Sequence, residues 1–464
     1  MKVMKFGGTS LADHQRFANV AKIINEAAQS QTIAVVLSAP ATVTNHLMAM
    51  IRLAAGGENY QPNIASVEQI FSDIYTDMAD KLSEQQAKKS LQILNEQLEC
   101  WRNKLQGIAL LGDCPDKITA QILAGGEKLS IALMSTMLGI LETRCEQLNP
   151  QQLLLAYGDY LDASVNIEAS KARFAALDFS LAPVWLMAGF TAGNAKEELV
   201  TLGRNGSDYS AAVLAACLNA NACEIWTDVN GVYNIDPNLA FDAKLLPQLT
   251  YQEAMEISYF GAKVLHPKTI TPIAQYHIPC YIKNTLNPSL QGTLVSDQPD
   301  KTGLKVKAIS HLDSQTMFDI SGPKMKGMVG MASRTLSAIA QANISISLIT
   351  QSSSEYSISF CVASEYAEKA KIALENEFEL ELGSELLEPI RMRHELAIVS
   401  LIGDGMRTYK GVAAKFFQAL AQAAINIIAI AQGSSERSIS AVIKQTKTKH
   451  AIVACHQSFF DVQH

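Results

Sequence analysis

The sequence predicts an α/β protein in which a mostly parallel sheet between helices is followed by two small α+β modules. Residues 1 to about 295 alternate short apolar runs with helical patterns, which is typical of parallel strands covered by helices on both faces. A polar segment at about 300–306 then indicates a linker. Beyond it, residues 316–362 align without a gap onto 397–443, at an offset of 81 residues. Two copies are too few for a solenoid, so we expect two modules that pair their sheets.

The chain opens with a short apolar run that leads into Lys5-Phe6-Gly7-Gly8-Thr9-Ser10 and then into a helical pattern. We interpret this order as strand, glycine turn and helix, with Ser10 and Asp13 as a capping pair at the helix start. The N–H groups of Gly7 and Gly8 can cradle a phosphate, and Lys5 adds a positive charge beside them. The alternative is a tight turn without a ligand. The predicted buried stripe of the helix is Phe17, Val20, Ala21, Ile23 and Ile24.

Further strands are predicted at 33–37, 184–187, 224–227 and 279–282, where the apolar runs are short. Residues of about 66–110 instead carry a long helical period with many charges and glutamines, which indicates a helical excursion. Each repeat reads strand, glycine loop, helix, strand, turn and strand. We therefore expect domains over 1–297, 306–390 and 391–464, with the strand at about 306–312 assignable to the last of them.

Composition narrows the function classes. The net charge of −7 and the lack of a basic tract argue against nucleic acid as a partner. No apolar stretch reaches 18 residues, and the first residues do not resemble a signal peptide, so we expect no membrane association. The eight cysteines form no C-x-x-C motif, which predicts reduced core thiols and a cytoplasmic location. Metal-ligand spacing is also missing from the sequence, so no protein metal site is expected.

A second glycine-rich segment, 203–210, precedes an alanine-rich helix. Arg204 offers a fork for a carboxylate, and Asp208 can orient groups around a transferring phosphoryl. The alternative is that Ser207 and Asp208 only cap the helix.

Three further segments fit the same chemistry. A strand ends at Thr227-Asp228 and leads into a turn, and ligands of open α/β sheets bind at such strand ends. Lys263 can pair with phosphates, although a lone lysine is more often a surface charge. Glu127 can pair with an ammonium or simply face a helix dipole. His266, before a proline, is expected to be structural. Lysines, an arginine and acids around phosphate cradles are the groups that phosphoryl transfer needs.

Taken together, the segments 5–10, 36–39, 126–127, 203–210 and 260–267 resemble the aspartokinase family, in order along the whole chain. The resemblance is strongest to the aspartokinase portion of the bifunctional, threonine-sensitive aspartokinase/homoserine dehydrogenases. It implies an amino-acid-kinase fold, two ACT regulatory modules, and the transfer of the γ-phosphoryl of ATP, with Mg²⁺, to the β-carboxylate of L-aspartate.

The family motifs imply a role for each matching residue. Lys5 and Asp208 are the expected catalytic pair. Residues expected to bind aspartate are Ser38, Thr44, Glu127, Phe190, Arg204 and Ser207. Residues expected to bind ATP are Lys5, Gly7, Gly8, Thr227, Asp228, Tyr233 and Lys263. Residues expected to bind an inhibitory amino acid are Gln351, Gln432, Asn426 and Ser345.

Two departures from the family pattern matter. Asn238 stands where many relatives have the arginine of an Asp-Pro-Arg sequence, so a nucleotide contact is expected to be missing. The bifunctional relatives continue into a dehydrogenase, whereas this sequence ends at His464 without a G-x-G-x-x-G fingerprint, so dehydrogenase activity is not expected. A shortened chain and a naturally monofunctional one both fit this observation.

The resemblance leaves alternatives open. Threonine is the expected inhibitor and lysine the second choice, and a homodimer or tetramer through the ACT modules is expected. Another amino-acid kinase, for glutamate or acetylglutamate, is disfavoured because Arg204 and Glu127 fit a free α-amino acid. An amino-acid-binding regulatory protein with an inactive kinase domain is disfavoured by Lys5, Arg204 and Asp208.

Overall fold

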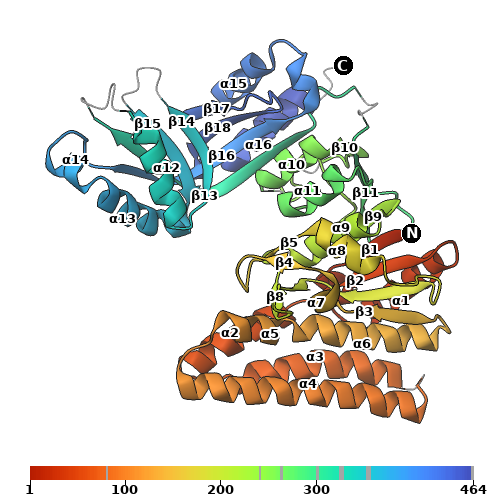
Figure 1. Cartoon of the computed structure of the whole chain (residues 1–464). Coiled ribbons are helices and arrows are strands. Elements are labelled where there is room, and N and C mark those ends of the chain that lie inside the picture. Colours follow the sequence, from red (N-terminus) through yellow and green to blue (C-terminus); the bar gives the residue numbers. More distant parts are fainter. Residues whose placement is uncertain are drawn as a thin grey trace. The chain divides into compact units, whose positions relative to one another are not determined.

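The computed structural model describes residues 1–79, 82–239, 242–261, 265–298, 303–322, 329–351 and 357–460. They form two compact units (Figure 1). The first unit comprises Met1–Val232, Leu245–Ala254 and Val264–Pro299. The second comprises Tyr233–Lys244, Met255–Lys263 and Asp300–His464. The domain boundaries expected from the sequence stay predictions.

The first unit is organised around one sheet, whose strand order is β10-β12-β11-β9-β1-β2-β6-β3. Neighbouring strands pair in parallel except β11 and β12, so the prediction of a mostly parallel sheet is confirmed. All five residues of β2 are buried, because helices cover both faces. The strands are β1 (Lys2–Phe6), β2 (Ile33–Leu37), β3 (Cys145–Leu148), β6 (Val184–Ala188), β9 (Ala222–Thr227), β10 (Gln248–Thr250), β11 (Cys280–Asn284) and β12 (Thr293–Ser296).

Helices and two small hairpins complete this part of the fold. The helices are α1 (His14–Ala28), α2 (Val43–Ala55), α3 (Gln61–Ala79), α4 (Glu84–Leu111), α5 (Asp116–Leu123), α6 (Gly125–Ile140), α7 (Pro150–Leu153), α8 (Ile167–Phe174), α9 (Gly206–Cys217) and α11 (Pro267–Gln275). A further helix, α10 (Tyr251–Tyr259), begins in the first unit, and its residues from Met255 onward belong to the second. The hairpins pair β4 (Ala156–Tyr157) with β5 (Ser164–Val165), and β7 (Thr191–Gly193) with β8 (Leu199–Thr201).

The first helix has the buried stripe that the sequence predicts, but its cap is a different residue. The side chains from Phe17 to Ile24 that form the predicted stripe are buried. However, Ser10 lies in a short 3₁₀ helix, η1 (Gly8–Leu11), and the cap of α1 is Asp13, whose carboxylate accepts a hydrogen bond from the Arg16 N–H at 2.9 Å. Ser10 instead hydrogen-bonds the Thr285 hydroxyl at 3.0 Å. The predicted capping pair is therefore wrong, because the 3₁₀ turn delays the start of the helix.

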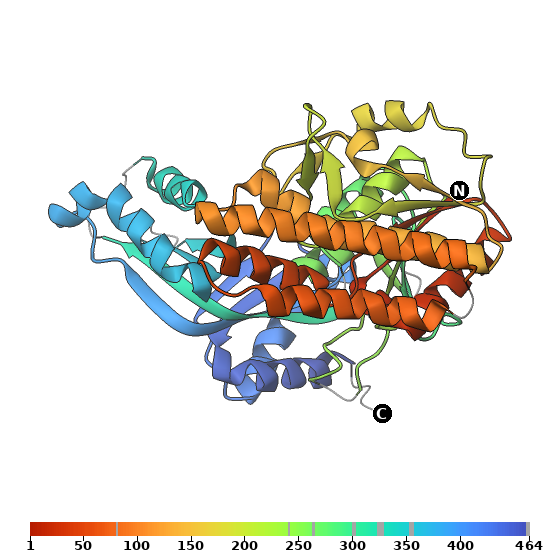
Figure 2. The ribbon, with the colours of Figure 1, turned by 90° about the horizontal axis from the view of Figure 1, so that it is seen from below.

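The stretch at about 66–110 is occupied by α3 and α4. A capping box at Ser83 and Gln86 starts α4, and its buried residues include Leu98 and Trp101. These two helices lie alongside each other and join α2 and α6 in a helical layer, which Figure 2 shows from below.

The second unit contains the repeat. Its elements are β13 (Ala308–Ser321), α12 (Met331–Gln341), β14 (Ile346–Gln351), β15 (Ser357–Ala363), η2 (Ser364–Tyr366), α13 (Ala367–Glu377), α14 (Glu379–Gly383), β16 (Arg391–Ile402), η3 (Asp404–Arg407), α15 (Val412–Gln422), β17 (Ala429–Gln432), β18 (Ser438–Lys444), η4 (Gln445–Lys447) and α16 (Thr448–Phe460). The bounds of α12 and α15 differ by the predicted offset. Each copy also has a helix after its last predicted strand, α13 or α16, so the repeat is longer than the sequence alignment indicates.

One sheet runs through both copies in the order β14-β15-β13-β16-β18-β17. The antiparallel pairing of β13 with β16 joins the copies, from Ala308 opposite Ile402 to Asp319 opposite Arg391. The second half of β13, with Phe318 and Ile320, packs in the first copy's core. The first half, with Ile309, packs instead among the second copy's buried side chains. The two end strands of the order, β14 and β17, approach each other (Figure 1).

Five of the eight cysteine side chains are buried and all eight are free, in line with the predicted core thiols. Among the described residues, no helix is long and apolar enough to cross a membrane.

Candidate active site

The candidate site lies at the carboxyl ends of the central strands, where loops from distant parts of the sequence meet. Backbone hydrogen bonds hold these loops in order: Gly7 N–H to the Trp226 carbonyl at 3.2 Å, Ser38 N–H to Phe6 at 3.2 Å, and Gly189 N–H to Leu37 at 2.9 Å. Because β9, β1, β2 and β6 are neighbours, the residues that follow them are brought side by side.

Lys5 and Asp208 form an ion pair at the centre of this edge. The Lys5 Nζ lies 2.5 Å from an Asp208 carboxylate oxygen, and only 8% of Lys5 is exposed. Lys5 comes from β1 and Asp208 from the first turn of α9, which packs against β1. A lysine held this way cannot turn into solvent, so its charge stays directed at the site.

Gly8 allows the loop after β1 to approach the loop after β2. A Cβ at Gly8 would lie 2.8 Å from the Ala39 carbonyl oxygen, closer than a side chain tolerates. The Ala41 N–H donates to the Gly8 carbonyl at 3.0 Å, so the two loops form one wall. The wall leaves space for a ligand beside the Lys5 ammonium.

Glu127 is a buried carboxylate at the start of α6. Its side chain is 3% exposed and accepts a hydrogen bond from the Ala39 N–H. Burial raises its pKa from 4.5 to about 7, against the lowering effect of its backbone hydrogen bonds. One carboxylate oxygen, Oε2, has no hydrogen-bond partner among the described residues. A buried acceptor of this kind fits a cationic ligand group.

Phe190 and the segment from Arg204 to Ser207 form the opposite wall. The Phe190 backbone has φ 67°, an unusual value for an aromatic residue, and its N–H donates to the Ser210 hydroxyl at 2.9 Å. Within the part of the chain that the structure describes, no carboxylate pairs with the exposed guanidinium of Arg204. It is therefore available to an anionic ligand.

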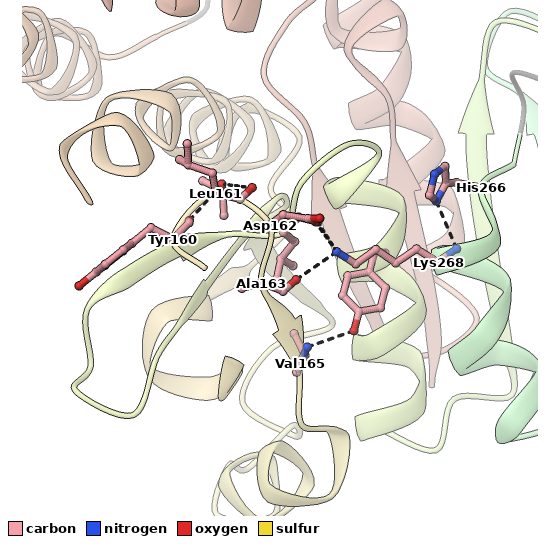
Figure 3. Close-up of polar contacts among 10 residues, drawn as sticks. Tyr160, Leu161, Asp162, Ala163, Val165, His266 and Lys268 are labelled. Atoms are coloured by element: carbon pink, nitrogen blue, oxygen red, sulfur yellow. Dashed lines mark hydrogen bonds and ion pairs between the residues drawn. The ribbon is translucent and has the colours of Figure 1, made fainter. Parts of the chain in front are cut away.

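His266 is structural, as expected from the sequence. Its Nδ1 accepts a hydrogen bond from the Lys268 N–H at 3.2 Å and so caps α11 (Figure 3). Burial lowers the His266 pKa, and the positive charges of Arg204 and Lys268 lower it further. The lowered pKa favours the neutral ring, which is the form that accepts this hydrogen bond.

A cavity of about 400 Å³ lies between these walls. It is lined by all of the residues expected to bind aspartate and by the expected catalytic pair. The predicted residues at its wall are Lys5, Gly8, Ser38, Thr44, Glu127, Phe190, Arg204, Ser207 and Asp208. Their placement is an observation, while their individual roles stay predictions. Thr42, Asn45 and Asn205 also line the cavity without having been predicted. Thr42 and Asn205 have positive φ values, and their residue types alone do not show that the backbone takes this conformation here.

A larger cavity of about 730 Å³ is lined by residues of α4, α5 and the first turns of α6, among them Lys104, Lys117 and Lys128, and by Glu198. None of the predicted site residues lines it. The smaller cavity is the better candidate, because it holds the buried ion pair and the loops at the strand ends.

The residues expected to bind ATP are distributed differently. Gly7 directly follows β1 and Thr227 ends β9, and neither is among the residues that line the 400 Å³ cavity. The Thr227 hydroxyl donates to the Asp228 carboxylate at 3.1 Å. Tyr233 belongs to the second unit, and Lys263 lies outside the described residues. Asn238, at the departure from the family pattern, hydrogen-bonds Asp236 in a local turn.

The four residues expected to bind an inhibitor occupy equivalent places in the two repeats. Gln351 ends β14 and Gln432 ends β17, the two end strands that approach each other. Ser345 and Asn426 precede the same strands. All four side chains are exposed, and nothing in the described residues tests their role.

Comparison with known proteins decides the family. The amino acid kinase family matches residues 1–284, and the ACT domain matches residues 318–378 and 399–459. The chain belongs to the amino acid kinase family. The amino-acid-kinase fold followed by two ACT domains is thus confirmed.

Relatives within the family are aspartokinases. The chain is 51% identical over 461 residues to a bifunctional aspartokinase/homoserine dehydrogenase of Haemophilus influenzae, which covers 99% of the chain and 57% of that protein. A Buchnera aphidicola protein of the same name is 45% identical over 99% of the chain and 56% of its own length. The chain therefore spans little more than half of these relatives. The resemblance to the aspartokinase portion of such proteins is confirmed.

A solved structure gives the same result. E. coli aspartokinase III in complex with aspartate and ADP matches with a TM-score of 0.85 and 26% identity, over 99% of this chain and 100% of that chain. The same enzyme in complex with lysine and aspartate matches with a TM-score of 0.77, again at 26% identity over 99% and 100%.

Proposed function

We propose that this protein is an aspartate kinase that transfers the γ-phosphoryl of ATP to the β-carboxylate of L-aspartate. One observation carries the proposal: the Lys5–Asp208 ion pair lines the same cavity as Arg204 and Glu127. An amino-acid substrate of this kind requires three charged groups. It needs a cation for the reacting groups, a second cation for its α-carboxylate and an anion for its ammonium. The aspartokinase relatives, and the aspartate and ADP bound in one solved structure, support the same function.

In this proposal, Arg204 binds the α-carboxylate of aspartate through two parallel hydrogen bonds, and Glu127 binds its ammonium. Ser38, Thr44, Phe190 and Ser207 line the remaining wall and fix the orientation of the side chain. Burial deprives the Glu127 carboxylate of hydrogen bonds with water, and its Oε2 has no partner among the described residues. An ammonium group beside it would replace those hydrogen bonds.

The reaction joins two anions, so charge neutralisation is its main requirement. An oxygen of the aspartate β-carboxylate forms a bond to the γ-phosphorus, and the bond from that phosphorus to the β,γ-bridging oxygen breaks. ADP leaves with the electron pair, and the product is 4-phospho-L-aspartate. Lys5 disperses the negative charge of the transferring group, and Asp208 keeps the Lys5 ammonium in place.

ATP is expected at the loops of Gly7, Gly8, Thr227 and Asp228, with Tyr233 and Lys263 as further contacts. The close approach at Gly8, beside the Lys5 ammonium, fits a phosphate chain. Mg²⁺ would supply charge neutralisation on those phosphates, and proteins commonly bind it through one or two carboxylates together with substrate phosphates. Asp228, directly after β9, and Asp208, in the first turn of α9, are the carboxylates that would hold it.

Regulation is part of the proposal. Feedback inhibition through the ACT domains follows from their presence, and threonine is the preferred effector, with lysine as the alternative. The structure of E. coli aspartokinase III in complex with lysine and aspartate supports an amino acid as the effector. Assembly into a homodimer or tetramer through the ACT domains is expected, and the eight free thiols fit the cytoplasm.

The test is a hydroxylamine trapping assay with MgATP and L-aspartate, with and without L-threonine or L-lysine. Aspartyl hydroxamate is the expected product, and threonine is expected to reduce it. Hydroxamate that responds only to lysine would reassign the effector. Folded protein that binds ATP but yields no hydroxamate would contradict the kinase and favour an amino-acid-binding regulatory protein.

A further inference from the structure

Lys268 connects three separate segments of the first unit. Its Nζ donates to the Asp162 carboxylate at 2.7 Å and to the Ala163 carbonyl at 3.1 Å (Figure 3). It also donates to the Leu202 carbonyl at 2.9 Å. These are all the protons that an ammonium group can donate. One side chain thus joins the segment before β5, the end of the β7–β8 hairpin, and α11.

The Leu202 carbonyl is the contact that matters for the site. Leu202 directly precedes Gly203, where the substrate loop 203–208 begins, and its N–H donates to the Phe190 carbonyl at 2.8 Å. The Leu202 peptide is therefore fixed on one side by Phe190, which lines the 400 Å³ cavity, and on the other by Lys268.

The same cluster restricts the next residue. Gly203 has φ 74°, and a Cβ there would lie 2.1 Å from the Asp162 carboxylate that Lys268 holds. A residue with a side chain would clash with Asp162 at this position, so the backbone can follow this path only because residue 203 is glycine. The direction in which the loop leaves toward Arg204 is consequently set by the Asp162–Lys268 pair.

Lys268 itself is mounted on a rigid element. Its backbone N–H is capped by His266 in the first turn of α11, and the adjacent Thr269 and Ile270 are buried. α11 packs closely on α9, the helix that carries Ser207 and Asp208. The Lys268 Nζ also lies 5.2 Å from the ring centre of Tyr209, whose hydroxyl accepts a hydrogen bond from the Val165 N–H at 3.1 Å.

Stability alone does not account for this arrangement. The Asp162 side chain is 73% exposed, and an ion pair so exposed contributes little to folding. The two backbone carbonyls are the more informative partners, because backbone hydrogen bonds fix a path of the chain rather than a loose surface contact.

We propose that Lys268 is a positioning residue that fixes the substrate loop 203–208, so that Arg204 meets the α-carboxylate of the amino-acid substrate. The proposal rests on the proposed function for the identity of that substrate. Lys268 is not among the residues that line the 400 Å³ cavity, and it acts through Leu202, Gly203 and Arg204.

The test compares Lys268→Met with Lys268→Arg and with a matched control, Lys171→Met. Lys171 is as exposed as Lys268, at 24% against 23% of the side chain, and it also has a carboxylate partner and a tyrosine ring beside it. The readouts are KM for aspartate and for ATP, kcat, amide hydrogen exchange over 202–208, and the rate of trypsin cleavage after the exposed Arg204.

For Lys268→Met we expect KM for aspartate to rise roughly 10- to 100-fold, with KM for ATP changed less than about twofold, because a small displacement of a positioning group costs rates of this order. Amides of 202–208 are expected to exchange several-fold faster, and cleavage after Arg204 to accelerate. Lys268→Arg is expected to recover part of both effects, and Lys171→Met to match the unmodified chain.

A double substitution separates positioning from general destabilisation. If Lys268 acts through Arg204, Lys268→Met adds little to the KM for aspartate of Arg204→Ala, whereas independent effects would multiply. Unchanged exchange and KM in Lys268→Met would overturn the proposal, as would full additivity. If the unmodified chain does not phosphorylate aspartate, the proposed function fails, while exchange and cleavage still decide whether Lys268 fixes the loop.

Discussion

The aspartate side and the nucleotide side of the candidate site are built in different ways. Every residue expected to bind aspartate lines one cavity in the first unit, between α6, α9 and the strand ends. Of the residues expected to bind ATP, Lys5 and Gly8 line the same cavity, Gly7, Thr227 and Asp228 lie at or just after the ends of β1 and β9, and Tyr233 belongs to the second unit. The segment that follows Tyr233 places Ile235 in the core of the second repeat. The residues expected to bind aspartate are thus gathered around one cavity, whereas those expected to bind ATP are spread over several segments of the chain.

The largest effect is expected where the two sides meet, at Lys5. Lys5→Met removes the cation of the buried ion pair, and we expect kcat to fall about 100- to 1,000-fold, as when a preorganised charge is removed from other active sites. Steady-state kinetics with both substrates measure it. Lys2→Met is the control, because Lys2 lies on the same strand but pairs with Glu224 at 2.9 Å. A kcat within threefold of the unmodified chain would contradict the role of Lys5.

Arg204→Ala tests the aspartate side alone. We expect KM for aspartate to rise about 10- to 100-fold through loss of a charged hydrogen bond, with KM for ATP nearly unchanged. Arg204→Lys keeps the charge but loses the planar fork, so it is expected to recover only part of the affinity. An equal increase in the KM for aspartate and the KM for ATP would contradict the assignment of Arg204 to the aspartate side alone.

The pH dependence of aspartate binding follows from Glu127. Its pKa is raised to about 7 by burial, and only the ionised form pairs with an ammonium. Between pH 8 and pH 6 the ionised fraction of free protein falls, so KM for aspartate is expected to rise about tenfold. KM for ATP serves as the internal control, and a flat aspartate profile would reject Glu127 as the ammonium partner.

The same shift has a consequence for folding. The folded chain binds the Glu127 proton more tightly than the unfolded chain does. The free energy of unfolding therefore contains a stabilising contribution from protonated Glu127. This contribution is fully present below the pKa of the unfolded chain and is lost as the pH rises through about 7. Glu127→Gln removes that loss. Urea unfolding at pH 8 should show the variant more stable by about 1–3 kcal/mol, although it binds aspartate poorly. Lower stability at pH 8 would contradict the raised pKa.

The smallest effect is expected on the nucleotide side. Thr227→Val removes the hydroxyl that donates to Asp228, and we expect KM for ATP to rise about two- to fivefold, the effect of one neutral hydrogen bond. Thr271→Val on α11 is the control, since its hydroxyl donates to the Pro267 carbonyl away from the site. If KM for aspartate changes instead, the assignment of Thr227 is wrong.

Much of the fold could be predicted because it depends on local patterns. The apolar run 33–37 is fully buried as β2, and the 81-residue offset reappears in the bounds of α12 and α15. The error at Ser10 has a local cause: a 3₁₀ turn intervenes, and sequence spacing does not distinguish it from the first turn of a helix. The pairing of β13 with β16 could not be predicted, because it depends on which edges meet in three dimensions.

In the candidate site, too, residues in local motifs could be predicted, whereas residues placed by long-range contacts could not. Residues in glycine motifs, such as Gly8 and Arg204, stand out in the sequence, and they do line one cavity. Asn45 and Lys268 have no such motif of their own. A single lysine in a helix resembles any surface lysine until Leu202 and Asp162, more than 60 residues away in the sequence, are seen around it. Long-range contacts of this kind are what the structure adds.

The long strands β13 and β16 bear on how the regulatory unit folds. Each of these strands pairs with a strand of its own repeat and with a strand of the other repeat, so neither repeat forms a complete sheet by itself. A chain cut after residue 390 would lose β16 and leave one edge of β13 without its partner. We therefore expect the two copies to melt in one cooperative transition rather than as two separate domains.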